Sequence, residues 1–235
     1  MEGEEILKLT DFGIAKIISP QEKTNTRLTG TGQIIGTPKY MSPEQLLGLT
    51  IKHRNRLPIK GPAIIIANHN SHIDTIVLMS LYPLGSLFKI RPVAAADYFL
   101  KNRYLEWFCK RVLQIIPIHR AVPKKKVNPL QTVEDALKQD SILIFYPEGT
   151  RGQPEQIGEF KKGIVRLAAK YPDVPIIPVY LQGLGKVLPK GKTLLVPFNI
   201  SAVVGKPIKK PEIGQDFCAY FRDQIRSLAE EINYA

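Results

Sequence analysis

The chain has 235 residues, of which 44% are hydrophobic and 23% charged, a composition typical of a folded globular protein and not of a disordered one. This length allows one ordinary domain, with or without a short appendage. The formal net charge of +12 is uneven, because residues 1–50 hold five Lys/Arg against six Asp/Glu and the rest of the chain therefore carries +13. A basic domain favours an anionic partner, such as nucleic acid, an anionic lipid surface or a phosphorylated substrate, and charge alone does not choose among them.

The cysteines and the apolar runs indicate in which compartment the protein is expected and how it could associate with a membrane. Cys109 and Cys218 are too few for a disulfide framework or a metal cluster, which favours reduced thiols in a cytosolic protein. The acidic N-terminus lacks the apolar core of a secretory signal. The longest apolar stretch, residues 75–88, is interrupted by Pro83 and Gly85. We therefore expect any membrane-bound form to lie on a bilayer rather than span it.

The first fifty residues differ in character from the rest. They contain "LKLTDFGIAK" and "GTPKYMSPEQ", which resemble the metal-binding turn and the closing motif of a bacterial Ser/Thr kinase activation segment. Asp11 matches the metal-binding aspartate, and Thr29 and Thr31 lie where activation-loop phosphosites occur. Phosphoryl transfer also needs a Gly-rich loop, a strand lysine and a catalytic Asp–Asn loop, and none precedes Asp11. We expect residues 1–50 to be a poorly ordered appendage without kinase activity and residues 51–235 to form the functional domain.

Beyond residue 50, apolar runs alternate with amphipathic segments. Strands are predicted within 63–67, 113–120, 142–146, 176–181 and 194–205, where Pro197 favours a sheet edge or a bulge. Apolar residues at helical spacing predict helices within 102–114, 130–137, 164–171 and 217–232. Strands separated by helices predict a single α/β domain with a largely parallel sheet flanked by helices.

The first candidate site is "NHNSHID", directly after the 63–67 strand. His69 lies at the carboxyl end of that strand, and Asp74 lies five residues later, near enough to hold one ring nitrogen and leave the other free as a general base. The same residues also match a capping box, with Ser71 as the N-cap and Asp74 three residues later. The sequence is compatible with both the catalytic pair and the capping box. His72 has no carboxylate at matching spacing and is assigned to the surface or to a supporting role.

The second candidate site is "FYPEGTRG", after the 142–146 strand. Gly149 allows a tight turn, Thr150 offers a hydroxyl, and Arg151 offers a planar fork suited to phosphate oxygens. Glu148 can pair with an arginine or accept a substrate hydroxyl. Lys161 lies at the start of the next helix, where an anion is also favoured. The alternative is an ordinary strand-to-loop turn with solvated charges.

A third strand, in "LQIIPIHR", delivers Arg120 in a similar position. If the carboxyl ends of these strands share one edge of the sheet, a base and phosphate-binding arginines come together. Such a set suggests a hydroxyl nucleophile on a phosphorylated substrate.

Four ordered blocks, "NHNSHID", "IIPIHR", "FYPEGTR" and "VPIIPVYL", with "FKKG" after the third, resemble the glycerolipid acyltransferases over roughly residues 55–235. The resemblance implies acyl transfer from acyl-CoA or acyl-carrier protein to a lysophospholipid acceptor, with no cofactor and no metal. The family's residue pattern implies the following roles: His69 as the base in the HX4D motif, Asp74 as its holder, Arg120, Gly149, Thr150 and Arg151 as the phosphate grip, and Glu148 as the residue that orders it.

The chain departs from the family pattern at two positions. His119 stands where Asp or Asn is usual, and Tyr146 stands where the third block usually begins with Phe. The fourth block, around Pro175 and Pro178, is implied to line the sheet core or the acyl tunnel. Neither departure touches the His69–Asp74 pair, whereas His119 bears on how the acceptor binds.

Two other functions are less compatible with the sequence than acyl transfer. A regulatory, pseudokinase-like module with a degenerate acyltransferase body conflicts with the intact His69–Asp74 pair and Arg151. A nucleic-acid binder rests on charge alone, without zinc spacing or a recognition motif, so we expect no nucleic-acid partner.

The setting expected for acyl transfer is a peripheral, cytoplasmic site on the inner face of the cell membrane. Residues 97–126 are the candidate contact with an anionic bilayer, since Trp107 and Phe108 are followed by Lys124, Lys125 and Lys126. The equally weighted alternative is an ordinary amphipathic helix packed on the sheet, with Leu105, Phe108 and Val112 as its core-facing stripe.

Overall fold

The computed structural model describes residues 6–10, 14–18, 49–71, 73–96, 103–118, 128–153, 156–187, 200–208 and 216–233. Within the first 48 residues it describes the backbone of β1 (Ile6–Thr10) and β2 (Ile14–Ile18), which form an antiparallel pair. Asp11, Thr29 and Thr31, on which the kinase resemblance depends, lie outside the described residues, as does most of the segment expected to be poorly ordered.

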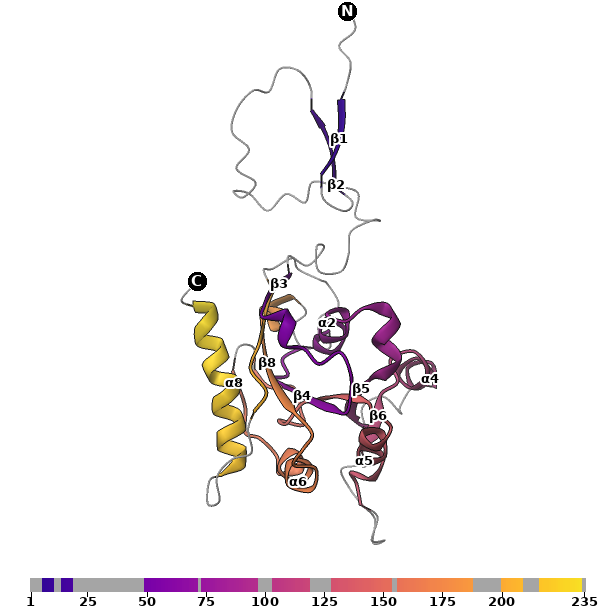
Figure 1. Cartoon of the computed structure of the whole chain (residues 1–235), viewed down its shortest axis with the longest axis vertical. Helices are drawn as coiled ribbons and strands as arrows, with labels where there is room; N and C mark the ends of the chain where they lie inside the picture. The colour runs from indigo at the N-terminus through magenta and orange to yellow at the C-terminus, as the bar shows by residue number, and fades with distance from the viewer. Residues whose placement is uncertain are drawn as a thin grey trace, which may run out of the picture.

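The main body is built on a seven-stranded sheet (Figure 1). Its strands run in the order β3-β9-β8-β4-β7-β5-β6. Their bounds are β3 Leu49–Lys52, β4 Ala63–Ala67, β5 Ile90–Ala95, β6 Ile116–Ile118, β7 Ile142–Phe145, β8 Ile176–Gln182 and β9 Ile200–Val204. All neighbouring pairs are parallel except β8 and β9, which are antiparallel. The predicted α/β fold with a largely parallel sheet is therefore confirmed.

Helices cover both faces of the sheet (Figure 1). Their bounds are η2 Arg54–Arg56, α2 Asp74–Ser80, η3 Leu84–Lys89, α4 Arg103–Arg111, α5 Gln131–Lys138, α6 Gly163–Lys170, α7 Leu184–Val187 and α8 Phe217–Asn233. Side chains of α2 and η3 pack on one hydrophobic cluster, and side chains of α5, α6 and α8 pack on the other. The four predicted helices correspond to α4, α5, α6 and α8.

The sequence of β4 explains this layered arrangement. Every residue of "AIIIA" is buried, as expected for a parallel strand with both faces covered. Because side chains alternate along a strand, Ile65 faces the α2 side while Ile64 and Ile66 face the α6 and α8 side. On that second side, α8 contributes Phe221, Ile225 and Leu228 at helical spacing. Apolar residues on both faces of the central strands therefore hold three layers together.

The main sheet begins at Leu49, so the predicted domain boundary at residue 51 falls inside β3. β3 pairs with β9 and is an edge strand of the sheet. None of the described helices has both the length and the apolar character needed to cross a membrane.

Candidate active site

The carboxyl ends of β4 and β7 bring two predicted site residues together. In the parallel register of these strands, Ile66 pairs with Phe145. His69 and Glu148 each follow three residues later, so they reach the same edge of the sheet at the same level. The backbone N–H of His69 donates to Glu148 Oε1 at 3.0 Å. Contact between segments 79 residues apart in the chain is thus set by strand register.

His69 and Asp74 form the pair that their spacing suggests. His69 Nδ1 and Asp74 Oδ2 are 2.8 Å apart. The carboxylate is fully buried, while 20% of the His69 side chain is exposed. If Nδ1 carries the proton that Asp74 accepts, Nε2 is the nitrogen with a free lone pair.

The predicted capping box is formed in part, and it shares the carboxylate that contacts the imidazole; Ser71 itself is not the N-cap of α2. Asp74 Oδ2 also accepts the backbone N–H groups of Asn70 at 2.7 Å and Ser71 at 2.8 Å. The bond to Ser71 is the return half of a capping box, although α2 itself begins at Asp74 with Ile73 as its N-cap. One carboxylate oxygen therefore fixes both the turn before α2 and the imidazole. His72 lies outside the described residues.

Tyr146 supports the imidazole from a second direction. The two rings stack with their centroids 4.1 Å apart and their planes inclined by 19°. The Tyr146 hydroxyl lies 3.0 Å from Thr75 Oγ1, on the first turn of α2. Burial raises the pKa of the Tyr146 hydroxyl well above its ordinary value, so it remains a neutral hydrogen-bonding group. Sequence reasoning noted Tyr146 only as a departure from a pattern and missed this contact.

Glu148 links the loop that follows β4 to the loop that follows β7. It is only 5% exposed, and its second oxygen, Oε2, accepts the backbone N–H of Gly158 at 3.1 Å. Cβ atoms added at Gly152 and Gly158 would lie 2.9 Å and 2.8 Å from Oε2, so the loop closes on the carboxylate. Burial raises the pKa of this carboxyl, and its backbone hydrogen bonds oppose that shift.

Asn68 anchors the same edge from the other side. Its side-chain amide donates to the Leu181 carbonyl, and its side-chain oxygen accepts the Leu181 N–H, both at 2.8 Å. The residue before His69 is thereby fixed to β8. Sequence reasoning assigned no role to Asn68, because the partner strand and its register are not visible in the sequence.

The residues proposed to hold phosphate lie in the turn after β7. Gly149 has a positive φ of 68°, which favours glycine, and a Cβ there would lie 3.1 Å from Lys161 Nζ. Lys161 is held in place by its backbone N–H, which donates to the Pro147 carbonyl at 2.9 Å. Thr150 and Lys161 are exposed, and Arg151 is half-buried. The turn thus brings a cationic side chain close to the Gly149 backbone, and the next residue along the chain, Thr150, carries a hydroxyl.

Arg120 and His119 lie outside the described residues. β6, which precedes them, ends at the same edge as β4, but β7 and β5 stand between the two strands. At about 4.8 Å per strand, the ends of β4 and β6 are roughly 14 Å apart.

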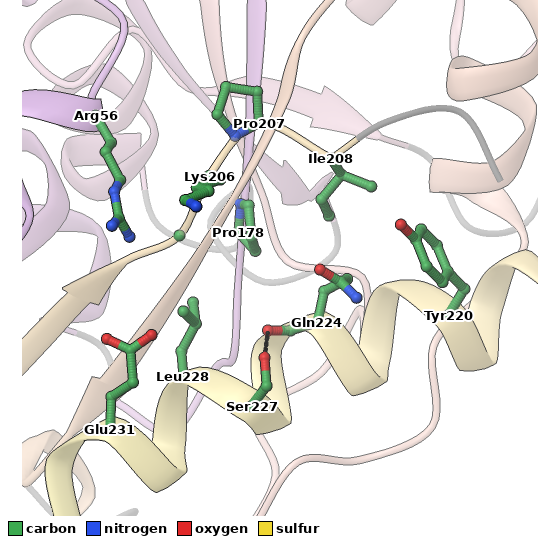
Figure 2. Close-up of a pocket in the computed structure, with 11 residues that line it drawn as sticks. Arg56, Pro178, Lys206, Pro207, Ile208, Tyr220, Gln224, Ser227, Leu228 and Glu231 are labelled. Carbon is green, nitrogen blue, oxygen red and sulfur yellow. Dashed lines mark hydrogen bonds between the residues drawn. The ribbon is translucent and has the colours of Figure 1, made fainter.

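A groove of about 430 Å³ lies away from this edge, between α8 and the segment after β9 (Figure 2). Pro178 lies in its wall, whereas Pro175 precedes β8. Ile208 at the groove bridges to the first residue of β8, and Asn68 binds near the last, so the groove and the His69–Asp74 pair lie toward opposite ends of that strand. Glu231 binds His53 at 3.2 Å there, and Arg56 donates to a β9 carbonyl, so these groups hold the sheet edge.

The sequence is similar to a protein family and to individual proteins of known name. Residues 48–182 match the family model described as Acyltransferase. A chloroplastic 1-acyl-sn-glycerol-3-phosphate acyltransferase of Arabidopsis thaliana is 32% identical over 148 residues, which cover 63% of this chain and 39% of that protein. A probable 1-acyl-sn-glycerol-3-phosphate acyltransferase of Mycoplasma genitalium is 33% identical over 130 residues, which cover 54% of this chain and 47% of that protein.

The fold is also similar to a solved structure. The crystal structure of the 1-acyl-sn-glycerophosphate acyltransferase PlsC from Thermotoga maritima superposes with a TM-score of 0.64 at 22% identity, over 81% of this chain and 75% of that one. The chain spans between 39% and 52% of the length of the first three curated relatives. The family model covers more than half of the chain and includes His69, Asp74 and the turn after β7. The chain therefore belongs to the Acyltransferase family.

Proposed function

We propose that the protein transfers an acyl group to the free hydroxyl of 1-acylglycerol 3-phosphate, giving phosphatidic acid. The observation that carries this proposal is the 2.8 Å contact between His69 Nδ1 and the buried Asp74 carboxylate at the carboxyl edge of the sheet. The names of the relatives from Arabidopsis thaliana and Mycoplasma genitalium support the choice of acceptor. The donor is a thioester, either acyl-CoA or acyl-carrier protein.

In the proposed reaction, His69 Nε2 takes the proton of the acceptor hydroxyl. The hydroxyl oxygen then attacks the thioester carbonyl carbon and forms a tetrahedral intermediate. Collapse of this intermediate forms the new ester bond and breaks the carbon–sulfur bond, and the leaving thiolate takes the proton back from the imidazolium. Asp74 stabilises that imidazolium and keeps Nε2 directed at the acceptor.

The acceptor phosphate is proposed to bind at the turn after β7. Arg151, Thr150, the Gly149 backbone and Lys161 supply cationic or hydrogen-bonding groups within one short segment and the residue packed over it. Arg120 is proposed to complete the grip from the segment after β6. Glu148 orders this site rather than touching substrate, because both of its oxygens accept backbone N–H groups.

We place the reaction at an anionic membrane surface, with the protein peripheral on the cytoplasmic face. The acceptor is an amphiphile whose acyl chain partitions into a bilayer, and the basic charge of residues 51–235 favours an anionic one.

An acceptor and donor panel tests this function. The full chain is assayed with radiolabelled acyl-CoA and acyl-carrier protein against 1-acylglycerol 3-phosphate, glycerol 3-phosphate and lysophosphatidylcholine. Labelled phosphatidic acid should be the main product. Preferential acylation of lysophosphatidylcholine would exclude the proposed acceptor.

Arg151→Ala tests the phosphate grip. Loss of a charge-assisted hydrogen bond of about 1.5–3 kcal/mol should raise the acceptor KM roughly 10- to 100-fold and leave the donor KM nearly unchanged. Arg166→Ala, on the exposed side of α6, is the matched control and should change neither value. A normal acceptor KM with a raised donor KM would move Arg151 to the donor site.

A further inference from the structure

Large apolar side chains are exposed on one layer of the molecule. Six of them come from α2, η3, α4 and the residue after α4: Ile76, Leu84, Phe88, Trp107, Phe108 and Val112. Leu84 is 86% exposed, Trp107 62% and Phe88 60%. Among the described residues, the other large hydrophobic side chain with comparable exposure is Ile59. Side chains of this size exposed together mark a contact surface.

These elements cover the same face of the sheet. Val77 and Leu78 of α2 belong to one hydrophobic cluster, and Leu87 of η3 and Leu113, just after α4, pack against that cluster. The six exposed side chains therefore project from the outer side of a single layer, which we name the α2–α4 face. α5, α6 and α8 pack on the opposite side of the sheet (Figure 1).

The charge on the α2–α4 face is one-sided. Lys89, Arg103, Lys110 and Arg111 are exposed there. Within the described residues from 75 to 113, Glu106 is the acidic residue, and it binds Lys110 at 2.6 Å. Lys89 Nζ lies 5.9 Å from the centre of the Phe88 ring, so cationic and aromatic groups are interleaved.

We propose that the α2–α4 face docks on an anionic phospholipid bilayer. Exposed Trp and Phe side chains suit the headgroup region, and the surrounding Lys and Arg side chains suit anionic lipid. α2 begins at Asp74, so the docked layer leads directly to the catalytic pair. The inference rests on the proposed function for its purpose, which is to bring the site to an acceptor held in a membrane.

The residues proposed here for the membrane contact differ from those expected from the sequence. Lys124, Lys125 and Lys126, the basic run expected from the sequence, lie outside the described residues. The alternative of a core-facing stripe is wrong for Phe108 and Val112, which are 41% and 51% exposed, while Cys109 is buried instead. Ile76, Leu84 and Phe88, which come from other segments, extend the surface beyond the helix that the sequence suggested.

Trp107 is the single tryptophan of the chain and reports directly on this face. Its fluorescence is followed while the full chain is titrated with vesicles of phosphatidylcholine alone or with added phosphatidylglycerol, all free of lysophospholipid. The emission should shift to shorter wavelength with the anionic vesicles, and brominated acyl chains should quench it. Sedimentation with anionic vesicles but unchanged Trp107 emission would mean that another surface binds, and would overturn the proposal.

Paired variants separate the face from the overall charge. Lys89→Gln, Arg103→Gln and Arg111→Gln together should weaken partitioning to anionic vesicles roughly 100-fold, from about 1 kcal/mol for each basic residue near the surface. Lys138→Gln, Arg166→Gln and Lys206→Gln remove the same charge elsewhere and should have a much smaller effect. Equal losses in the two triple variants would contradict a specific face.

An apolar pair of variants completes the test. Phe88→Ser with Val112→Ser should weaken vesicle binding, whereas Ile59→Ser, at a side chain 75% exposed in the segment between η2 and β4, should not. Loss of self-association in the double variant, with vesicle binding intact, would assign the face to a second copy of the chain instead.

Acylation of a short-chain, water-soluble 1-acylglycerol 3-phosphate should be unchanged in every variant. Vesicle binding without any acyl transfer would refute the proposed function and leave the docking face standing.

Discussion

Asp74 serves two purposes through one oxygen. Oδ2 lies 2.8 Å from His69 Nδ1 and accepts the backbone N–H groups of Asn70 and Ser71 at 2.7 Å and 2.8 Å. The N–H donors hold the carboxylate in place whether or not the imidazole is protonated. In the proposed mechanism, this fully buried carboxylate is pre-organised to stabilise the imidazolium that forms when His69 takes a proton. Local backbone structure and catalytic geometry thus depend on the same side chain.

Tyr146 is expected to act through its ring more than its hydroxyl. Tyr146→Phe keeps the stacking on His69 and loses only the bond to Thr75, so kcat should stay within about threefold of wild type, a change of about 0.65 kcal/mol at the low end of net hydrogen-bond contributions. Tyr146→Ala removes the stacking surface and should lower kcat roughly tenfold or more, because misplacement of a catalytic group is costly. Steady-state kinetics of both variants decide this, and equal losses in the two would assign the effect to the hydroxyl.

Substitution of Glu148 should change kcat and leave the acceptor KM nearly unchanged. In Glu148→Gln one of the two backbone N–H groups, from His69 or Gly158, meets an amide NH2 instead of an acceptor. The His69 backbone then shifts, and kcat should fall roughly 10- to 100-fold with little change in acceptor KM. A large rise in acceptor KM at normal kcat would show instead that Glu148 contacts the substrate.

The pH dependence of stability gives a second measure of Glu148. Burial raises its pKa above the ordinary value of 4.5, so the folded state holds this proton more tightly than the unfolded state does. Its contribution to stability is fully present below the ordinary pKa and is lost as pH rises through the raised one. The Tm of Glu148→Gln relative to wild type should therefore increase as pH rises from about 4 to about 7. A constant difference in Tm, measured by thermal unfolding, would contradict the raised pKa.

At the scale of the elements, an uninterrupted apolar run decided which strands the sequence could predict. β4, β7 and β8 lie in the middle of the sheet and consist largely of buried aliphatic residues, so each appears as an apolar run. β5 was not predicted, because Arg91 and Pro92 interrupt "IRPVAA" and Pro92 has no N–H to donate. β3 was not predicted either, since four residues at the sheet edge with one exposed carry little pattern.

In the candidate site, local contacts could be predicted from the sequence, whereas contacts between distant segments could not. The His69–Asp74 contact is local, five residues apart, and follows from spacing and the turn into α2. The bonds from Glu148 to His69 and from Asn68 to Leu181 join residues 79 and 113 positions apart. They depend on the register of β4 against β7 and β8, which periodicity alone does not determine.

The N-terminal segment can be tested by truncation. The main sheet begins at β3 and the family model begins at residue 48, so removal of residues 1–45 leaves both intact. The shortened protein should keep its Tm within about 2 °C and most of its acyl transfer to a soluble acceptor. A matched truncation that also removes β3 should lower the Tm clearly, because β9 loses its partner. A loss of several degrees in the first truncation would mean that the segment stabilises the domain.

Across the whole molecule, the described features lie on three distinct regions. The proposed catalytic pair and the proposed phosphate-binding turn lie at the carboxyl edge of the sheet, the α2–α4 face covers one side of it, and the groove beside α8 lies toward the other end of β8. Because α2 begins at Asp74 and carries exposed Ile76, the catalytic edge and the α2–α4 face are continuous through one helix. This layout suits an enzyme that takes its acceptor from a surface.

The most direct test of the account is the rate of acyl transfer by His69→Ala. The backbone of His69, through its bonds to Glu148 and Gly152, remains in place when the side chain is removed, so the variant should fold with a Tm close to that of wild type. Loss of the general base should lower kcat for transfer from acyl-CoA or acyl-carrier protein to 1-acylglycerol 3-phosphate on the order of 10²–10⁴-fold. A folded His69→Ala protein that forms phosphatidic acid at nearly the wild-type rate would contradict the account.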